Sequence, residues 1–102
     1  MKVTNKYNKL SFRKKFVFFS RKLNIKYKKI TFKKMRNKWA STSTAGNFTF
    51  NTELFKKKKS LCNYVMVHEL LHIKIPNHGK LWKALMISNF KNYKKLETQL
   101  NL

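Results

Sequence analysis

An H-E-x-x-H pattern at residues 68–72 constrains the fold of this chain more than any other feature, because it requires an α-helix. Residues four apart lie on one helix face, so His68 and His72 can both reach a single ion. Glu69 is rotated by roughly 100° from His68, so its carboxylate can meet a water at an open coordination position instead of binding the ion. Pro76 is expected to end the helix, since the residue before a proline is pushed out of the helical conformation.

The third histidine completes a ligand set. All three histidines of the chain lie within residues 68–78, and the break at Pro76 lets His78 turn back toward the helix. Three neutral imidazoles leave the full charge of a divalent ion, which strongly acidifies bound water. The spacing therefore predicts a Zn²⁺ site formed by His68, His72 and His78, with Glu69 as the catalytic base.

Apolar periodicity predicts an α+β fold with an early helix, a small sheet that contains antiparallel strands, the H-E-x-x-H helix and further helices. The expected helices are 10–23 with Ser11 as a cap, 61–73 with Ser60 as N-cap, 79–90 and 93–100; the expected strands are 28–35 and 47–51, joined as a hairpin, with a polar turn at 41–46.

Length and composition indicate one folded domain over residues 1–102. Nine Phe, four Tyr and two Trp supply enough apolar area for a core. Cys62 is the only cysteine, so no intrachain disulfide can form. The longest apolar run, residues 16–19, is too short for a signal-peptide core or a membrane span, which leads us to expect a cytoplasmic protein with no membrane partner.

The formal net charge of +22 predicts attraction to polyanions. Of the 25 basic residues only Arg13, Arg21 and Arg36 are arginine, although arginine dominates specific contacts with bases and phosphates. Such a balance favours a wholesale compositional bias over a dedicated binding face. We therefore expect non-specific attraction to nucleic acid, with specific binding as the alternative.

Four segments, residues 35–41, 46–51, 67–72 and 76–82, resemble the YgjP-like zinc metallopeptidase family. The resemblance covers roughly the last two thirds of the chain and is weaker before that. Thr42 stands where the family often has a cysteine.

This resemblance implies a minimal zincin-like domain, similar to a gluzincin or SprT-like core. It implies zinc on His68, His72 and His78, a catalytic Glu69, and a peptide substrate lying along residues 47–51 as an edge strand. The spacing of His78 also matches metzincins, but Ile75 occupies their glycine position and no Met-turn is evident.

Several other residues have a structural and a functional interpretation. Trp39 is expected to pack in the core or against a hairpin, with a substrate contact as the alternative. Trp82 is expected to pack against the helix of residues 61–73. Arg36 is expected to be a solvated strand residue, with stabilisation of an oxyanion or a phosphate as the alternative.

Asn51 and Glu53 are candidates for orienting a ligand histidine, although backbone carbonyls could do the same. Cys62 is expected to be small and buried, not a ligand.

The sequence thus predicts a zinc-dependent metallohydrolase. A peptidase that acts on a peptide or protein is favoured over other kinds of hydrolase. Cleavage of nucleotide or other phosphoanhydride bonds is one alternative, which the positive charge would favour. Proteolysis of DNA-bound proteins is a variant that also uses this charge. A basic nucleic-acid-associated module with structural zinc is another, but such sites are normally closed by four protein ligands. The sequence does not indicate an oligomeric state.

Overall fold

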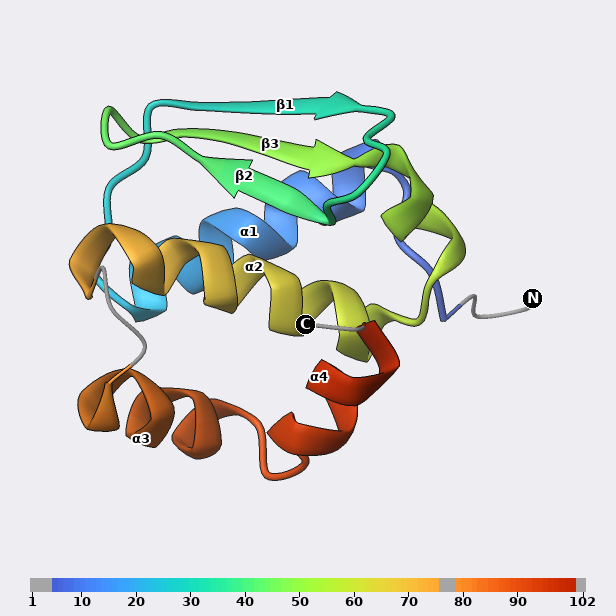
Figure 1. The fold of residues 1–102 in the computed structure, drawn as a ribbon. Coiled ribbons are helices and arrows are strands. Elements are labelled where there is room, and N and C mark those ends of the chain that lie inside the picture. Colours follow the sequence, from blue (N-terminus) through green and yellow to red (C-terminus); the bar gives the residue numbers. More distant parts are fainter. Residues whose placement is uncertain (1–4, 76–78, 101–102) are drawn as a thin grey trace.

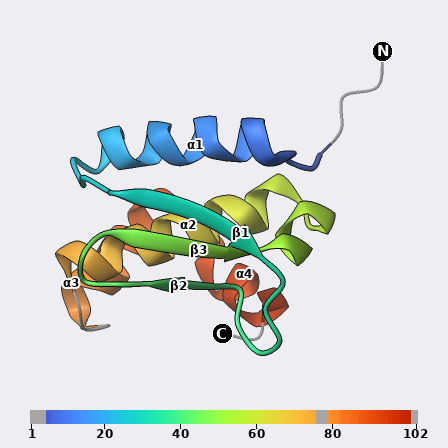
Figure 2. The same ribbon diagram turned by 90° about the horizontal axis from the view of Figure 1, so that it is seen from above.

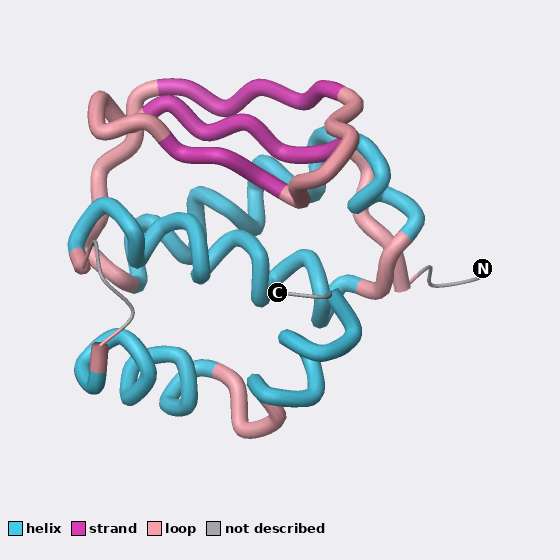
Figure 3. Tube along the Cα trace, viewed as in Figure 1, coloured by secondary structure: helices cyan, strands magenta, loops and turns pink. Residues whose placement is uncertain are grey.

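The computed structural model describes residues 5–75 and 79–100, which form helices and one small sheet (Figure 3). In chain order the elements are α1 (Lys9–Lys22), β1 (Lys29–Lys33), β2 (Ala40–Thr42), β3 (Asn47–Asn51), a short 3-10 helix (Thr52–Lys56), α2 (Lys59–Lys74), α3 (Lys80–Asn89) and α4 (Tyr93–Leu100). The predicted α+β class is confirmed.

The elements stack in layers, with α2 in the middle (Figure 1). The sheet lies on one side of α1 and α2, whereas α3 and α4 lie on the opposite side of α2. Seen from above, α1 runs beside the β1 edge of the sheet (Figure 2). Helix α2 is therefore enclosed by other elements, which explains why its apolar residues are not confined to a single stripe.

The sheet has the strand order β1-β3-β2, with β1 parallel and β2 antiparallel to β3. The predicted hairpin between residues 28–35 and 47–51 is wrong, because the intervening chain reverses twice and forms β2 between them in sequence. The polar turn is shorter than predicted, since Ser41 and Thr42 belong to β2 and the reversal occurs between Ser43 and Gly46. Gly46 has a φ of 92°, a conformation that favours glycine.

The edge of the sheet also differs from the expectation. Residues 47–51 form the central strand, so they cannot be the edge strand along which a substrate would lie. Among the described residues the edges are β1 and β2, and β2 packs against α2. A strand-like substrate near α2 would therefore have to pair with β2.

Two predicted helix caps are corrected. Asn8, not Ser11, caps α1: its side chain accepts from the Ser11 backbone, and the Ser11 side chain accepts from the Asn8 backbone. Ser60 lies inside α2, whose N-cap is Lys58. At the other end, Ile75 adopts an extended conformation, as expected for the residue before a proline.

Aromatic side chains fill the space between α1 and the sheet. Phe12 and Phe16 of α1 are fully buried, and each packs edge-to-face with Phe50 of β3 at ring-centroid distances of 4.9 and 5.5 Å. Burying such a side chain stabilises the fold by roughly 1.5–3 kcal/mol. This core fixes β3, and through β3 the position of β2 over α2.

Candidate active site

Three side chains of α2 converge on one point. His68, Glu69 and His72 each offer a ligand atom, and these atoms all lie within 4.8 Å of one another. The two imidazole rings are 4.6 Å apart, as expected for positions one turn apart on a helix. The structure thus brings together the three residues of the H-E-x-x-H pattern that were predicted to act together. His78, the third predicted ligand, lies outside the described residues, as does Pro76.

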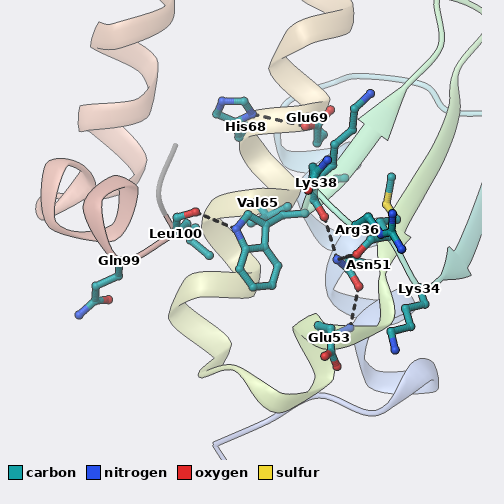
Figure 4. A pocket seen from close by; sticks show the side chains of 14 residues that line it. Lys34, Arg36, Lys38, Asn51, Glu53, Val65, His68, Glu69, Gln99 and Leu100 are labelled. Atoms are coloured by element: carbon teal, nitrogen blue, oxygen red, sulfur yellow. Dashed lines mark hydrogen bonds and ion pairs between the residues drawn. The ribbon is translucent and has the colours of Figure 1, made fainter.

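The Glu69 carboxylate is held between the sheet and the histidines. Its side chain is only 13% exposed. The hydroxyl of Thr42 donates a 2.5 Å hydrogen bond to Oε2, while Oε1 lies 3.6 Å from Nδ1 of His68 (Figure 4 shows the latter contact).

Burial and charge act in opposite directions on this carboxyl group. Burial favours the neutral acid and would raise the pKa of Glu69, but hydrogen bonds from His68 and Thr42 and the positive charges of His68 and His72 outweigh it. The pKa therefore lies below its ordinary value. An ionised carboxylate is the form that can accept a proton, so this environment suits a general base.

Aromatic rings pack around the histidines. Trp82 of α3 is buried, and its ring lies 5.1 Å from that of His68 and 6.3 Å from that of His72. The prediction that Trp82 packs against the H-E-x-x-H helix is confirmed. On α2 itself, the ring of Tyr64 lies 6.0 Å from that of His68. These contacts restrict the orientation of both imidazoles.

A cavity of about 650 Å³ adjoins His68 and Glu69. The loop between β1 and β2 forms one wall and contributes three basic residues, Lys34, Arg36 and Lys38 (Figure 4). Arg36 is exposed, as expected of a solvated residue, but it lies in the β1–β2 loop and not on a strand, and it lines the cavity next to the site. The cavity is large enough for several side chains of an extended peptide.

The predicted packing role of Trp39 is consistent with its surroundings. It is half-buried, packs against the core, and donates a 2.8 Å hydrogen bond from its indole to the carbonyl of Leu100. Because both residues also line the cavity, Trp39 joins the β1–β2 loop to the end of α4 at the cavity wall.

The hydrogen bonds of Asn51 and Glu53 do not lead to a histidine. The Asn51 amide donates to the carbonyls of Met35 and Lys38, at 3.0 and 2.7 Å, and its side-chain oxygen accepts from the Glu53 backbone. The Glu53 carboxylate pairs with Lys56 at 3.1 Å on the surface. Asn51 therefore holds the cavity loop in place, a role that its position at the end of a strand did not indicate.

Cys62 is buried, and its thiol donates to the carbonyl of Leu54 at 3.1 Å. Burial raises the pKa of this thiol to about 12, so it stays protonated and is unsuited to bind a metal. Over residues 5–75 and 79–100, the group of His68, Glu69 and His72 is the one cluster of such side chains that could hold an ion. A closed structural zinc site that includes Cys62 is therefore not supported.

Comparison with known proteins places this arrangement in a class. The crystal structure of the metallopeptidase zymogen of Methanocaldococcus jannaschii jannalysin has a TM-score of 0.74 and 25% sequence identity, with 86% of this chain and 91% of that chain covered. The zymogen of Pyrococcus abyssi abylysin has a TM-score of 0.76 and 16% identity, with 86% and 90% covered, which shows likeness of fold. No curated protein matches the sequence significantly. The fold and the H-E-x-x-H helix define a metallopeptidase.

The family follows from the sequence itself. The model of the family described as "YgjP-like, metallopeptidase domain" matches residues 2–102. The chain therefore belongs to the YgjP-like metallopeptidase family. The family assignment, the zincin-like fold and the peptidase activity predicted from the sequence are thereby confirmed. Neither phosphoanhydride hydrolysis nor a structural-zinc module gains support from these comparisons. No helix in the described part of the chain has the length and apolarity needed to cross a bilayer.

Proposed function

We propose that this metallopeptidase binds zinc through His68, His72 and His78 and uses Glu69 as its general base. The observation that carries the proposal is the convergence of His68, Glu69 and His72 within 4.8 Å on one turn of a largely buried helix. Imidazoles are donors that suit zinc, and a carboxylate beside them can meet a water held by the ion. The one cysteine, Cys62, is buried and donates to the Leu54 carbonyl, so it does not close the site.

The surroundings of α3 support His78 as the third ligand. His78 directly precedes Gly79, the N-cap of α3. Trp82, in the first turn of α3, contacts the rings of both His68 and His72. The start of α3 therefore lies beside the two helix histidines, within reach of a short connection from Ile75.

The residues of the chain divide the catalytic work. Bound zinc would polarise the scissile carbonyl and acidify the attacking water. The three histidines hold the ion as neutral imidazoles, so they take no part in proton transfer. Glu69 accepts the proton of the attacking water and then delivers it to the leaving amine. The hydrogen bond from Thr42, one of the contacts that lower the pKa of Glu69, does not depend on the charge of the histidines and favours the ionised carboxylate needed for the first transfer.

The backbone of β2 offers a place for the substrate. Trp39 and Ser43 form backbone hydrogen bonds with β3, through Asn51 and Asn47 at 2.9 Å. Backbone groups alternate in direction along an antiparallel strand, so those of Ala40 and Thr42 face the open edge. We propose that an extended peptide pairs with this edge next to Glu69, as in other cases of strand addition.

The charge of the cavity points to a preference among peptides. Lys34, Arg36 and Lys38 line the cavity beside Glu69, in a protein whose net charge is +22. Acidic side chains would be attracted there, whereas lysine and arginine would be repelled. We expect peptides with Asp or Glu near the scissile bond to be cleaved with a higher kcat/KM than matched peptides with Lys.

The test is a panel of quenched fluorescent peptides, acidic and basic, incubated with zinc-loaded protein. Both solved relatives are zymogens, so protein nicked by limited proteolysis is assayed beside the intact chain. Glu69→Gln should retain close to one zinc per chain and lose turnover by about 10²-fold or more. His72→Ala should lose the zinc. Full turnover by Glu69→Gln, or stoichiometric zinc in His72→Ala, would contradict the assignment.

Three further expectations stay predictions: a single domain over residues 1–102, a cytoplasmic location, and non-specific attraction to nucleic acid. The last is tested by the salt dependence of DNA binding, which should be steep if lysine-to-phosphate attraction is responsible.

A further inference from the structure

The contact between Thr42 and Glu69 joins two elements that are far apart in the sequence. Thr42 lies on β2 and Glu69 on α2, and the donor and acceptor are 2.5 Å apart in a partly buried setting. A hydrogen bond to an ionised carboxylate is short and stronger than one between neutral groups. The hydroxyl of Thr42 is therefore a specific partner of the carboxylate assigned above as the general base.

The position of the hydroxyl is set by the sheet. Thr42 pairs with Phe48 of β3, which is buried in the core. Directly after Thr42, the chain turns and closes with a 3.0 Å hydrogen bond from the Gly46 amide to the Ser43 carbonyl. Threonine is β-branched, so its side chain has few rotamers on a strand. The donor thus sits on a rigid element, not on a flexible loop.

The two oxygens of Glu69 have different neighbours. Oε2 accepts from Thr42 on the sheet side, while Oε1 lies on the side of His68. Occupying one oxygen fixes the rotation of the carboxylate plane and leaves the other oxygen on the histidine side. General-base catalysis depends strongly on such orientation.

We propose that Thr42 is a positioning residue: its hydroxyl orients the Glu69 carboxylate so that the oxygen facing the histidines receives the proton of the attacking water. This inference rests on the proposed role of Glu69. It also assigns a function to the position at which the family often has a cysteine, a residue with a weaker hydrogen-bond donor.

The experiment compares side chains of matched shape. Thr42→Val removes the hydroxyl with little change in volume, and Thr42→Ser keeps the hydroxyl. Thr49→Val is the control, because Thr49 lies on β3 between the buried residues Phe48 and Phe50 and so faces the opposite side of the sheet. Zinc content, kcat and KM are measured for each variant.

We expect Thr42→Val to retain zinc and to change KM by less than about threefold, while kcat falls about 10- to 100-fold, part of the contribution of a positioned base. Thr42→Ser should restore kcat to within about threefold of the parent, and Thr49→Val should not differ from it. Unchanged kcat in Thr42→Val would overturn the proposal, as would a loss in Thr42→Ser equal to that in Thr42→Val.

A second measurement needs no turnover. In metal-free protein, the effect of Thr42→Val on the unfolding equilibrium constant is compared in the parent and in a Glu69→Ala background. We expect Thr42→Val to raise the constant about 10-fold or more in the parent and much less without the carboxylate. Equal effects in both backgrounds would overturn the contact itself. By contrast, full activity of Glu69→Gln would overturn the role of Glu69 as the general base. Failure of the positioning proposal can thus be distinguished from failure of the proposed function.

Discussion

Replacing Asn51 tests whether one buried amide holds the wall of the active-site cavity. Asn51 is 4% exposed, and its side chain makes three hydrogen bonds: two to carbonyls of the β1–β2 loop and one from the backbone at the start of the 3-10 helix. In Asn51→Ala all three are lost, and two loop carbonyls lose their donor.

The expected loss of stability follows from these contacts. Each hydrogen bond contributes about 0.5–1.5 kcal/mol, so Asn51→Ala should lower the free energy of unfolding by about 2–3 kcal/mol. In a domain of this size, such a loss lowers Tm by about 10–20 °C. Asn51→Asp should cost at least as much, because it keeps the acceptor for Glu53 but places a negative charge against the carbonyls of Met35 and Lys38.

Urea and thermal unfolding followed by circular dichroism measure both quantities. Asn47→Ala is the matched control, since Asn47 is exposed at the other end of the same strand and its side chain should contribute little. A decrease in Tm of less than about 3 °C for Asn51→Ala would refute the reasoning. A variant that is destabilised should also bind peptides more weakly, seen as a raised KM, because the loop carrying Lys34 and Arg36 is released.

Two further predictions concern ionisable groups. Cys62 should not react with a thiol reagent at pH 8 in the native protein and should react fully in urea, because burial raises its pKa to about 12; rapid native labelling would contradict this. In the metal-free protein, Glu69 has a pKa lowered from 4.5, so it stabilises the fold above that pH and this contribution is lost as the pH falls through the lower, folded value. As the pH is lowered from 5 to about 2, the free energy of unfolding should therefore decrease less in Glu69→Gln than in the parent. Equal decreases in the two proteins would contradict the stabilising role of the Glu69 carboxylate.

Local pattern was sufficient for most of the elements. The strand at Asn47–Asn51 and the helix at Tyr93–Leu100 have the predicted bounds, since each shows a clear period of alternation or of helical spacing. Strand β2 was missed because Ala40–Thr42 is short and lacks an apolar alternation. Without β2, the chain between β1 and β3 reads as a single reversal, and a hairpin was the natural prediction.

Part of the candidate site could also be predicted from local sequence, and part could not. His68, Glu69 and His72 belong to one helical turn, so their convergence follows from helix geometry alone. The hydrogen bond from Thr42 to Glu69 spans 27 positions, and those from Asn51 to the cavity loop depend on where the sheet places that loop. No local period encodes such contacts. The one signal for Thr42 was its place directly after residues 35–41, a segment that resembles the family.

The excess of positive charge acts at the active site whatever its origin. Of the three carboxylate residues in the chain, Glu53 is paired with Lys56 on the surface, Glu97 lies on α4, and Glu69 faces the histidines. A net charge of +22 creates a positive potential that favours the ionised form of Glu69 and attracts negatively charged groups. The same potential opposes the binding of a further cation, so the ligand cluster must offset it locally. The Glu69 carboxylate, held by Thr42 within 4.8 Å of both histidine ligand atoms, supplies the nearest negative charge.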